Sequence, residues 1–479
     1  MDATLQDIEH IVVLMLENRS FDHMLGYLAL DDDYVASYGP IEGIVPGRSN
    51  AYEGVEYPVY PLEQTAMNDY DRPEHAGPHV DIQLSGGNGG FAHDFVETLR
   101  RNAGFTDVRP DQCVVMGYHT GAQLPALDHL ARNFTMCDHW FSSVPGATWP
   151  NRLYSMAGTS GGTRSNKKHL GKDFPIYNFP SIARYLDEAT VTWRWYRPYE
   201  AIPATIQLVE ETHRLGGPQM HEYDQFFHDA LTGELPKVSW IDPSFFHVLG
   251  MRQNDDHPPM DIRAGEHLIR AISNAVMTSP CWQRTLLIVT YDEHGGFYDH
   301  MEPPRAEDDF AETSRFGVRV PAVLVSPFTP ARVHSVQLDH TSIIRTILER
   351  FCPDVDPASM GKRVSHAESV ASAVVGSANE PSPPRPIPEL TDVRALTPGS
   401  SEPDTAHEPK VLEDLLAQSQ DGFDLLQRVQ QELTAGRAAL APDTALQLDE
   451  LQEGLVIAAG EIGRLNVMAI PPAGRRVVS

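Results

Sequence analysis

Residues 9–23 of the chain read EHIVVLMLENRSFDH, and this stretch decides the fold. Residues 11–16 are consecutive apolar side chains that include Ile and Val, a pattern typical of a strand buried on both faces of a parallel sheet. The run stops abruptly at Glu17 and Asn18. Ligands of parallel sheets bind at the carboxyl ends of the strands. We therefore interpret the polar cluster as part of a reaction centre, with a surface turn as the alternative.

Similar short apolar runs recur further along the chain. They are TVTWRWY (190–196), KVSWI (237–241), TLLIVT (285–290) and VPAVLVS (320–326). Stretches with helical periodicity occur among them and after them, for example at 261–277 and 341–351. Near-continuous apolar strands that alternate with helices predict an α/β domain whose mostly parallel central sheet is flanked by helices.

The composition excludes several classes of protein. The chain has 479 residues, 41% of them hydrophobic, and a formal net charge of -29. A surface this acidic does not suit nucleic acid, which selects basic patches. The cysteines are scattered and show no CxxC spacing, which disfavours a thiolate zinc site and a disulfide framework. They are Cys113, Cys137, Cys281 and Cys352.

The sequence also predicts the cellular compartment of the protein. It opens MDATLQDIEH, without a basic and apolar leader, and none of its apolar runs is long enough to cross a bilayer. We therefore expect a cytoplasmic protein. Secretion by a leaderless route and peripheral contact with a membrane are the alternatives that this pattern permits.

The composition changes after residue 375. We predict a catalytic domain over 1–375, a Pro-rich linker over 376–409 and a helical hairpin over 410–479. Leucines at helical spacing on both arms of the hairpin give each helix an apolar stripe, and GRAALAPD separates the two helices. The hairpin would dock on the core, pair with a second copy of the chain or bind a partner.

A second acidic cluster follows another predicted strand. TLLIVT runs into YDEHGGFYDH (291–300), so that Asp292 and Glu293 stand where Glu17 and Asn18 stand in the first cluster. Carboxylate and amide oxygens suit hard or borderline divalent cations. The two glycines that follow would let the backbone turn tightly beside a ligand. A solvated turn is the alternative interpretation.

A hydroxyl in the loop DHWFSSVPGATWPNR (138–152) is the candidate nucleophile. Thr148 lies in a stretch rich in Pro and Gly, where a neighbouring metal could lower its pKa and stabilise the alkoxide. It could instead cap a helix that begins near Asn151. Ser160 in MAGTSGG is a second candidate, although this stretch lacks the G-x-S-x-G pattern of a serine hydrolase.

Among the 21 histidines, the candidates near turns that we single out are His79, His257 and His340. A phosphoryl group needs hydrogen-bond donors around its oxygens and a proton donor for the leaving group. Each histidine alone reads as structural, but together with the two acidic clusters they form a candidate site for phosphoryl chemistry.

Several segments resemble the family of phosphatidylcholine-type phospholipases C and acid phosphatases. They are ENRSFDHMLGYL, FSSVPGATWPNRLY, SWIDPSFF, NDDHPPMD, TLLIVTYDEHGGFYDH, VRVPAVLVSPF and DHTSIIRTILERF. They occur in the family's order from about residue 8 to residue 352. The resemblance implies an alkaline-phosphatase-like α/β core, and a phosphoric ester hydrolase that uses one or more divalent metal ions, with Zn, Mn, Mg and Ca as the candidates.

The resemblance also assigns roles to matching residues. It implies that Glu17, Asn18, Asp292 and Glu293 bind the metal, and that Thr148 is both nucleophile and metal ligand. A Thr at this position is typical of the phospholipase members, whereas phosphatase members tend to have Ser.

The same resemblance places further residues around the substrate. His79 matches the family's phosphate-binding histidine, with His75 as the competing candidate, and either His79 or His257 would protonate the leaving group. The other expected substrate-binding residues are Asp256, His294 and His340. The stretches 31–70 and 376–479 have no counterpart in the resemblance.

We therefore expect a metal-dependent phospholipase C. It would cleave a phosphatidylcholine-like phospholipid to diacylglycerol and a phospho-head group through a phosphothreonine intermediate. Trp140, Trp149 and Tyr298 could cage a choline, or they could be core aromatics. An acid phosphatase acting on small phosphoesters and a secreted effector phospholipase are the alternative functions. A binding protein on a degenerate fold is disfavoured, because the expected ligands and nucleophile are all present.

Overall fold

The computed structural model describes residues 3–166, 177–198, 204–209, 211–212, 219–245 and 253–390. The chain divides into two compact units, Met1–Leu396 and Thr397–Ser479, and the described residues all belong to the first. The predicted hairpin and most of the predicted linker lie outside the described residues, so the proposed domain boundaries stay predictions.

An eight-stranded sheet forms the centre of this first unit, in the order β13-β6-β12-β11-β1-β10-β8-β9. The strands are β1 (His10–Leu16), β6 (Thr135–Cys137), β8 (Trp193–Arg197), β9 (Met220–Glu222), β10 (Val238–Ile241), β11 (Thr285–Tyr291), β12 (Ala322–Val325) and β13 (Arg332–His334). Only β12 runs against its neighbours, and the remaining pairs in the sheet are parallel. The prediction of a mostly parallel central sheet is therefore confirmed.

The sequence of β1 explains its central place. Every side chain from Ile11 to Leu16 is buried, and so is every side chain of β11, as expected for strands covered on both faces. The two strands pair in register along their whole length, from His10 opposite Thr285 to Leu16 opposite Tyr291. This pairing brings their carboxyl ends together.

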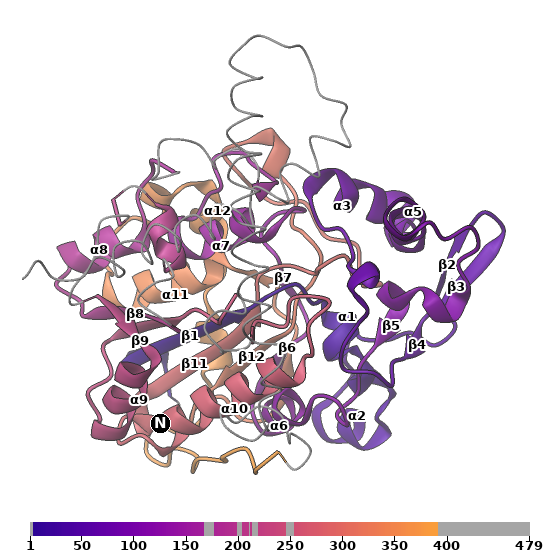
Figure 1. The fold of residues 1–479 in the computed structure, drawn as a ribbon. Coiled ribbons are helices and arrows are strands. Elements are labelled where there is room, and N and C mark those ends of the chain that lie inside the picture. The colour runs from indigo at the N-terminus through magenta and orange to yellow at the C-terminus, as the bar shows by residue number, and fades with distance from the viewer. Residues whose placement is uncertain are drawn as a thin grey trace, which may run out of the picture. The chain divides into compact units, whose positions relative to one another are not determined.

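Helices cover both faces of the sheet (Figure 1). One group contains α6 (Pro125–Asn133), α9 (Tyr223–Thr232) and α10 (Arg263–Thr278), and the other contains α7 (Thr148–Ala157), α8 (Ile182–Glu188), α11 (Thr341–Phe351) and α12 (Lys362–His366). The predicted helices at 261–277 and 341–351 correspond to α10 and α11. Both bury an apolar face that includes Ile269 and Ile272 in α10, and Ile343 and Ile347 in α11.

A smaller group of elements lies beside the sheet, on the right in Figure 1. It contains the hairpin β2 (Ser49–Tyr52) and β3 (Val55–Pro58), the parallel pair β4 (Tyr60–Pro61) and β5 (Gly117–Tyr118), and the helices α1 (Phe21–Met24), α2 (Asp32–Tyr38), α3 (Gly77–Gln83), α4 (Ser85–Asn88) and α5 (Phe91–Ala103). A second apolar core forms under α3 and α5. The stretch 31–70, which the resemblance left unassigned, builds part of this group.

Two short strands, β7 (Trp140–Phe141) and β14 (Leu338–Asp339), pair in parallel and precede the loop of Thr148 and the residue His340. No helix among the described residues is both long and apolar enough to span a membrane.

Candidate active site

The two acidic clusters meet at the carboxyl ends of β1 and β11. Because these strands are parallel neighbours in register, the residues that follow them leave the sheet side by side. The backbone N–H of Asn18 donates to Asp292 Oδ1 over 3.0 Å. Glu17, Asp292 and Glu293 are all buried. The structure thus brings together four of the five side chains that were expected to bind a metal, and Thr148 is the fifth.

The turns after both strands are tight. Asn18 has φ 61° and Gly295 has φ 63°, a backbone region that an L side chain rarely adopts. A Cβ atom on Gly295 would lie 2.1 Å from the carbonyl oxygen of Asn18. The glycine after Glu293 and His294 is therefore required for the two turns to approach each other.

Thr148 begins helix α7 and points at this cluster. Its hydroxyl donates to Asn18 Oδ1 over 3.4 Å, and its side chain is buried. The residue before it, Ala147, is the N-cap, so the alternative role of Thr148 as a helix cap is wrong. Asn151 fixes the preceding loop, because its Oδ1 accepts from the N–H of Val144 and its Nδ2 donates to the carbonyl of Gly146.

Arg152 lies between the carboxylates. Its Nε is 3.2 Å from Asp292 Oδ2 and 3.4 Å from Glu17 Oε1. Its Nη2 donates to the carbonyl oxygens of Met15 and Leu16, the last two residues of β1, over 3.1 and 3.0 Å. The guanidinium therefore joins α7 to the end of β1 and supplies one positive charge to the site.

One positive charge does not balance the three carboxyl groups. Burial, followed by the charge of Asp292, raises the pKa of Glu17 well above its usual range. Burial raises the pKa of Asp292 and raises that of Glu293 to about 8. Glu293 Oε1 is buried and has no hydrogen-bond partner among the described residues. These oxygens are the natural place for a divalent cation, since it would bring both charge and coordination.

The structure separates the two competing histidines. Both ring nitrogens of His75 lie 3.4 Å from Asn18 Nδ2, and His75 Nε2 lies 3.9 Å from Glu293 Oε1. His79 instead pairs with Asp94, whose Oδ1 is 2.7 Å from His79 Nδ1. Burial lowers the pKa of His79, but the hydrogen bond to Asp94 and the charge of Asp94 outweigh it, so the pKa is raised overall.

Helix α3, which contains His79, is nevertheless tied to the loop before Thr148. Arg164 donates to the carbonyls of Gly77 and Pro145, at 3.1 and 2.8 Å, and its own carbonyl accepts from the N–H of Ala147. The start of α3 is thereby held against the loop that ends at Thr148.

His294 connects Glu293 to helix α3 through Gln83. Its Nε2 lies 2.8 Å from Gln83 Oε1, while Gln83 Nε2 donates to Asp94 Oδ2 over 2.7 Å. His294 Nδ1 lies 3.2 Å from Glu293 Oε2. A single line of contacts thus runs from Glu293 through His294 and Gln83 to Asp94 and His79.

His257 lies next to His75, with ring centroids 5.7 Å apart in an edge-on arrangement. Its Nδ1 is 2.6 Å from the carbonyl of Pro258, and Arg72 Nη2 is 3.5 Å from its Nε2. Burial, with the positive charge of Arg72, holds the pKa of His257 well below its usual range. The two contacts make Nδ1 the donor to the Pro258 carbonyl and Nε2 the acceptor from Arg72.

His340 and Asp256 support the ends of the strands. His340 Nε2 lies 2.5 Å from the carbonyl of Asp292, and Trp140 Nε1 donates to the other ring nitrogen over 3.3 Å. Asp256 accepts from the Tyr291 hydroxyl over 2.6 Å, and its carbonyl accepts from Arg19. Both residues were expected at the substrate, and these contacts hold them against Asp292 and Tyr291 at the end of β11.

Comparisons with known proteins show which family the chain belongs to. Residues 8–352 match the model of the Phosphoesterase family. This chain belongs to the phosphoesterase family. Among curated relatives, non-specific phospholipase C6 of Arabidopsis thaliana is 32% identical over 370 residues, covering 72% of this chain and 68% of the relative. Phospholipase C B of Mycobacterium tuberculosis is 30% identical over 403 residues, covering 72% and 74%.

A distant likeness to solved structures is also found. An alkaline phosphatase superfamily protein from Vibrio parahaemolyticus is 13% identical, with a TM-score of 0.34, covering 49% of this chain and 61% of the other. The family expected from the sequence motifs is confirmed by the match over 8–352, and the phosphoesterase is a hydrolase of phosphoric esters.

Apart from the candidate active site, the phosphoesterase contains a group made of Asp22, Asp299 and His300. Their potential ligand atoms lie within 4.8 Å of one another. The guanidinium of Arg319 already supplies a cation to it, with Nη2 3.1 Å from Asp22 Oδ1 and Nε 3.0 Å from Asp299 Oδ1. This buried ion-pair network fastens α1 to the loop after β11. With His300 protonated, Arg319 and His300 balance the charges of Asp22 and Asp299 without a metal ion.

This network makes stability depend on pH. Burial lowers the pKa of His300, but its hydrogen bond to Asp22 and the charges of Asp22 and Asp299 outweigh both burial and Arg319 and raise it. Glu42 is the other carboxylate that faces the ring, at 3.8 Å. A histidine whose pKa is raised in the folded state stabilises the fold below its unfolded pKa, and this contribution is lost as pH rises through the folded pKa.

We therefore expect His300→Gln to lower the free energy of unfolding at pH of about 5.5, with the pH-dependent part of this loss gone by about pH 9. Urea unfolding at a series of pH values measures it. His366→Gln is the control, since its ring is bonded to the Lys362 carbonyl and not to a carboxylate. A loss for His300→Gln that is constant over the series would contradict the ion-pair interpretation.

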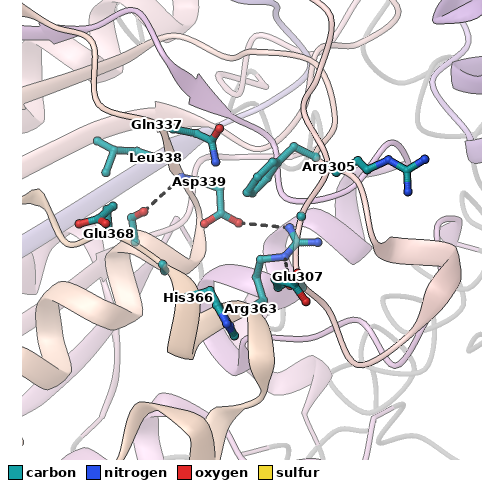
Figure 2. Close-up of a pocket in the computed structure, with 12 residues that line it drawn as sticks. Arg305, Glu307, Gln337, Leu338, Asp339, Arg363, His366 and Glu368 are labelled. Atoms are coloured by element: carbon teal, nitrogen blue, oxygen red, sulfur yellow. Dashed lines mark hydrogen bonds and ion pairs between the residues drawn. The ribbon is translucent and has the colours of Figure 1, made fainter.

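A cavity of about 360 Å³ lies elsewhere in the fold (Figure 2). It is lined by charged side chains that include Arg305, Glu307, Arg363 and His366. In its wall, Arg363 Nη1 lies 3.5 Å from Asp339 Oδ2. None of the expected site residues lines it, so the cavity is distinct from the site at the ends of β1 and β11.

Arg152 and Asn151 are the functional residues that reasoning from the sequence missed. Both belong to the same ATWPNR stretch as Thr148, but only the hydroxyl was given a role. A signal was available, because Arg152 follows Thr148 by four residues and therefore lies on the same face of a helix.

Proposed function

We propose that this phosphoesterase is a metal-dependent phospholipase C, which cleaves a phosphatidylcholine-like phospholipid to diacylglycerol and a phospho-head group. One observation carries the proposal: the Thr148 hydroxyl donates to Asn18 at the point where Glu17, Asp292 and Glu293 converge. Relatives at 30–32% identity that bear the name phospholipase C support the choice of substrate class.

The donor atoms suit a divalent cation. Glu17, Asp292 and Glu293 offer carboxylate oxygens, and Asn18 offers an amide oxygen that faces the Thr148 hydroxyl. An all-oxygen set favours Mg, Ca or Mn over softer ions. The unpartnered Glu293 Oε1 supports this assignment, since an ion would give this buried atom its missing partner.

In the proposed reaction, Thr148 Oγ1 attacks the phosphorus and forms a phosphothreonine, while the bond from phosphorus to the diacylglycerol oxygen breaks. A bound divalent cation would lower the pKa of the Thr148 hydroxyl and offset charge on the phosphoryl oxygens. Water then attacks the phosphorus, the bond to Thr148 breaks, and the phospho-head group leaves. Asn151 and Arg152 hold Thr148 and β1 in place throughout.

The histidines would divide the proton transfers between them. His79, with its raised pKa and its hydrogen bond to Asp94, suits donation of a proton to the leaving alkoxide. The same ring, once it has given up this proton, suits removal of a proton from water. His257 would take the smaller share, because its pKa is held well below the usual range and its Nε2 faces Arg72 Nη2. His75, close to Asn18 and Glu293, would contact the phosphoryl oxygens.

Of the three aromatic residues that could contact a choline head group, only one is exposed enough to do so. Trp140 is fully buried and Tyr298 is 6% exposed, so both act as core residues. Trp149 is partly exposed, follows Thr148 directly and contacts Phe245 edge-on at 5.9 Å. A choline beside Trp149 would gain cation–π attraction of about 1–2 kcal/mol.

A comparison of two substrates tests the proposal. We expect kcat/KM for p-nitrophenylphosphorylcholine to exceed that for p-nitrophenyl phosphate by at least about tenfold, because a diesterase site is built to bind a second ester group. Release of phosphocholine from phosphatidylcholine vesicles measures the natural reaction. Faster turnover of the monoester would identify an acid phosphatase on the same fold and refute the diesterase assignment.

A further inference from the structure

The buried cation of the site, Arg152, is not among the expected ligands or nucleophiles. It approaches Glu17 and Asp292 to 3.4 and 3.2 Å, and its side chain is only 2% exposed. Two of its remaining hydrogen bonds go to carbonyls at the end of β1, at Met15 and Leu16. Its position is therefore fixed by the strand as well as by the carboxylates.

The charges at this point can be counted. Glu17, Asp292 and Glu293 carry three negative charges when ionised, and Arg152 carries one positive charge, which leaves a net charge of −2. Two neighbouring carboxylates also act on Arg152 and are held separately. Asp242 accepts hydrogen bonds from Trp195 and Thr205, and Asp255 accepts from Gln253 and from the backbone N–H of His257. A net charge of −2 matches one divalent cation.

We propose that Arg152 sets the charge preference of the metal site and so makes it selective for divalent over trivalent cations. This inference rests on the proposed function, because it takes Glu17, Asn18, Asp292 and Glu293 as metal ligands. Arg152 is a positioning residue in this scheme: it touches the ligands and β1, and it acts on the ion through its charge. A trivalent ion is repelled by Arg152 more strongly than a divalent ion of the same size.

Ca²⁺ and Tb³⁺ make a suitable pair of probes because they have nearly the same radius and both prefer oxygen ligands. Isothermal titration calorimetry of the full chain gives the Kd of each ion, and the ratio of the two Kd values is the readout. Arg152→Met removes the charge and keeps most of the apolar length of the side chain. We expect it to shift the ratio toward Tb³⁺ by at least about tenfold, because each unit charge that is removed acts more strongly on the more highly charged ion.

Arg152→Lys is the matched control. It keeps the positive charge but loses the planar fork that reaches both carbonyls of β1, so we expect lower stability with an unchanged ratio. If Arg152→Met fails to fold, Arg152→Gln replaces it, since Gln can still donate to a carbonyl. A ratio in the charge-removing variant equal to that of the wild type would overturn the inference. Failure of the wild type to bind either ion would instead refute the metal site of the proposed function, and this inference with it.

Discussion

Thr148→Val is expected to lower kcat on p-nitrophenylphosphorylcholine by at least about 10³-fold, since loss of a covalent nucleophile removes the chemical step itself. Val has nearly the shape of Thr, so the packing of α7 against the sheet should survive. The hydroxyl that is lost donates to Asn18 Oδ1 and makes no cap to the helix. The free energy of unfolding should therefore change far less than the rate.

Two variants make this result specific. Thr148→Ser keeps a hydroxyl and should retain activity within about tenfold of the wild type, since the reacting atom is preserved. Thr159→Ala removes a hydroxyl that accepts from the N–H of Gly161 and should leave the rate unchanged. If Thr148→Val keeps more than roughly a tenth of the wild-type rate, Thr148 is not the nucleophile.

The central part of the fold and the meeting of the acidic clusters were predictable from the sequence. A continuous apolar run implies a strand buried on both faces, and parallel strands share the edge where ligands bind. Glu17 and Asp292 are far apart in the chain, yet both directly follow such a run, and the register of β1 and β11 places them together. The direction of β12 was not predictable, because an apolar run does not encode strand polarity.

The choice between His75 and His79 could not be made from the motif. Helix α3 begins at Gly77, so His75 lies before the helix and His79 lies inside it. Their side chains consequently take different directions, although the spacing of four residues would place them on one face of a continuous helix. The Gly-Pro pair at 77–78 is the signal for this boundary, because Pro favours the first turn of a helix.

Two groups of carboxylates in the folded protein look alike in the sequence and differ in the cations beside them. The first is the candidate active site, and the second is the ion-pair network of Asp22 and Asp299. ENRSFDH and YDEHGGFYDH each contribute to both clusters: Glu17 and Asp292 to one, Asp22 and Asp299 to the other. Arg319 arrives from a distant segment and, together with a protonated His300, balances the two carboxylates of the second. In the first, Arg152 leaves negative charge unbalanced. The three-dimensional arrangement was needed to tell a candidate metal site from an ion-pair network.

Because negative charge is left unbalanced at the candidate active site, we expect removal of divalent cations to have a large effect on turnover. Treatment with EDTA should abolish turnover, a loss of about 10²-fold or more, because a cation that offsets charge in the transition state is worth several kcal/mol. Adding back Mg²⁺, Mn²⁺ or Ca²⁺ should restore it. The melting temperature should also fall on chelation, since an ion present at about 100 times its Kd contributes about 2.7 kcal/mol to stability.

A pair of variants, one in each group of carboxylates, tests which group binds the metal ion. Asp292→Asn removes a carboxylate from the cluster with unbalanced charge, whereas Asp22→Asn removes one from the cluster that Arg319 and His300 pair with. We expect Asp292→Asn to lose bound metal by elemental analysis and to lose the rise in melting temperature on metal addition. Asp22→Asn should be less stable than the wild type and yet bind the same amount of metal. The reverse result, with metal lost from Asp22→Asn and kept in Asp292→Asn, would place the ion between Asp22, Asp299 and His300. Catalysis at Thr148 would then have to proceed without a cation at Asn18, and the unpartnered oxygen of Glu293 would need another explanation.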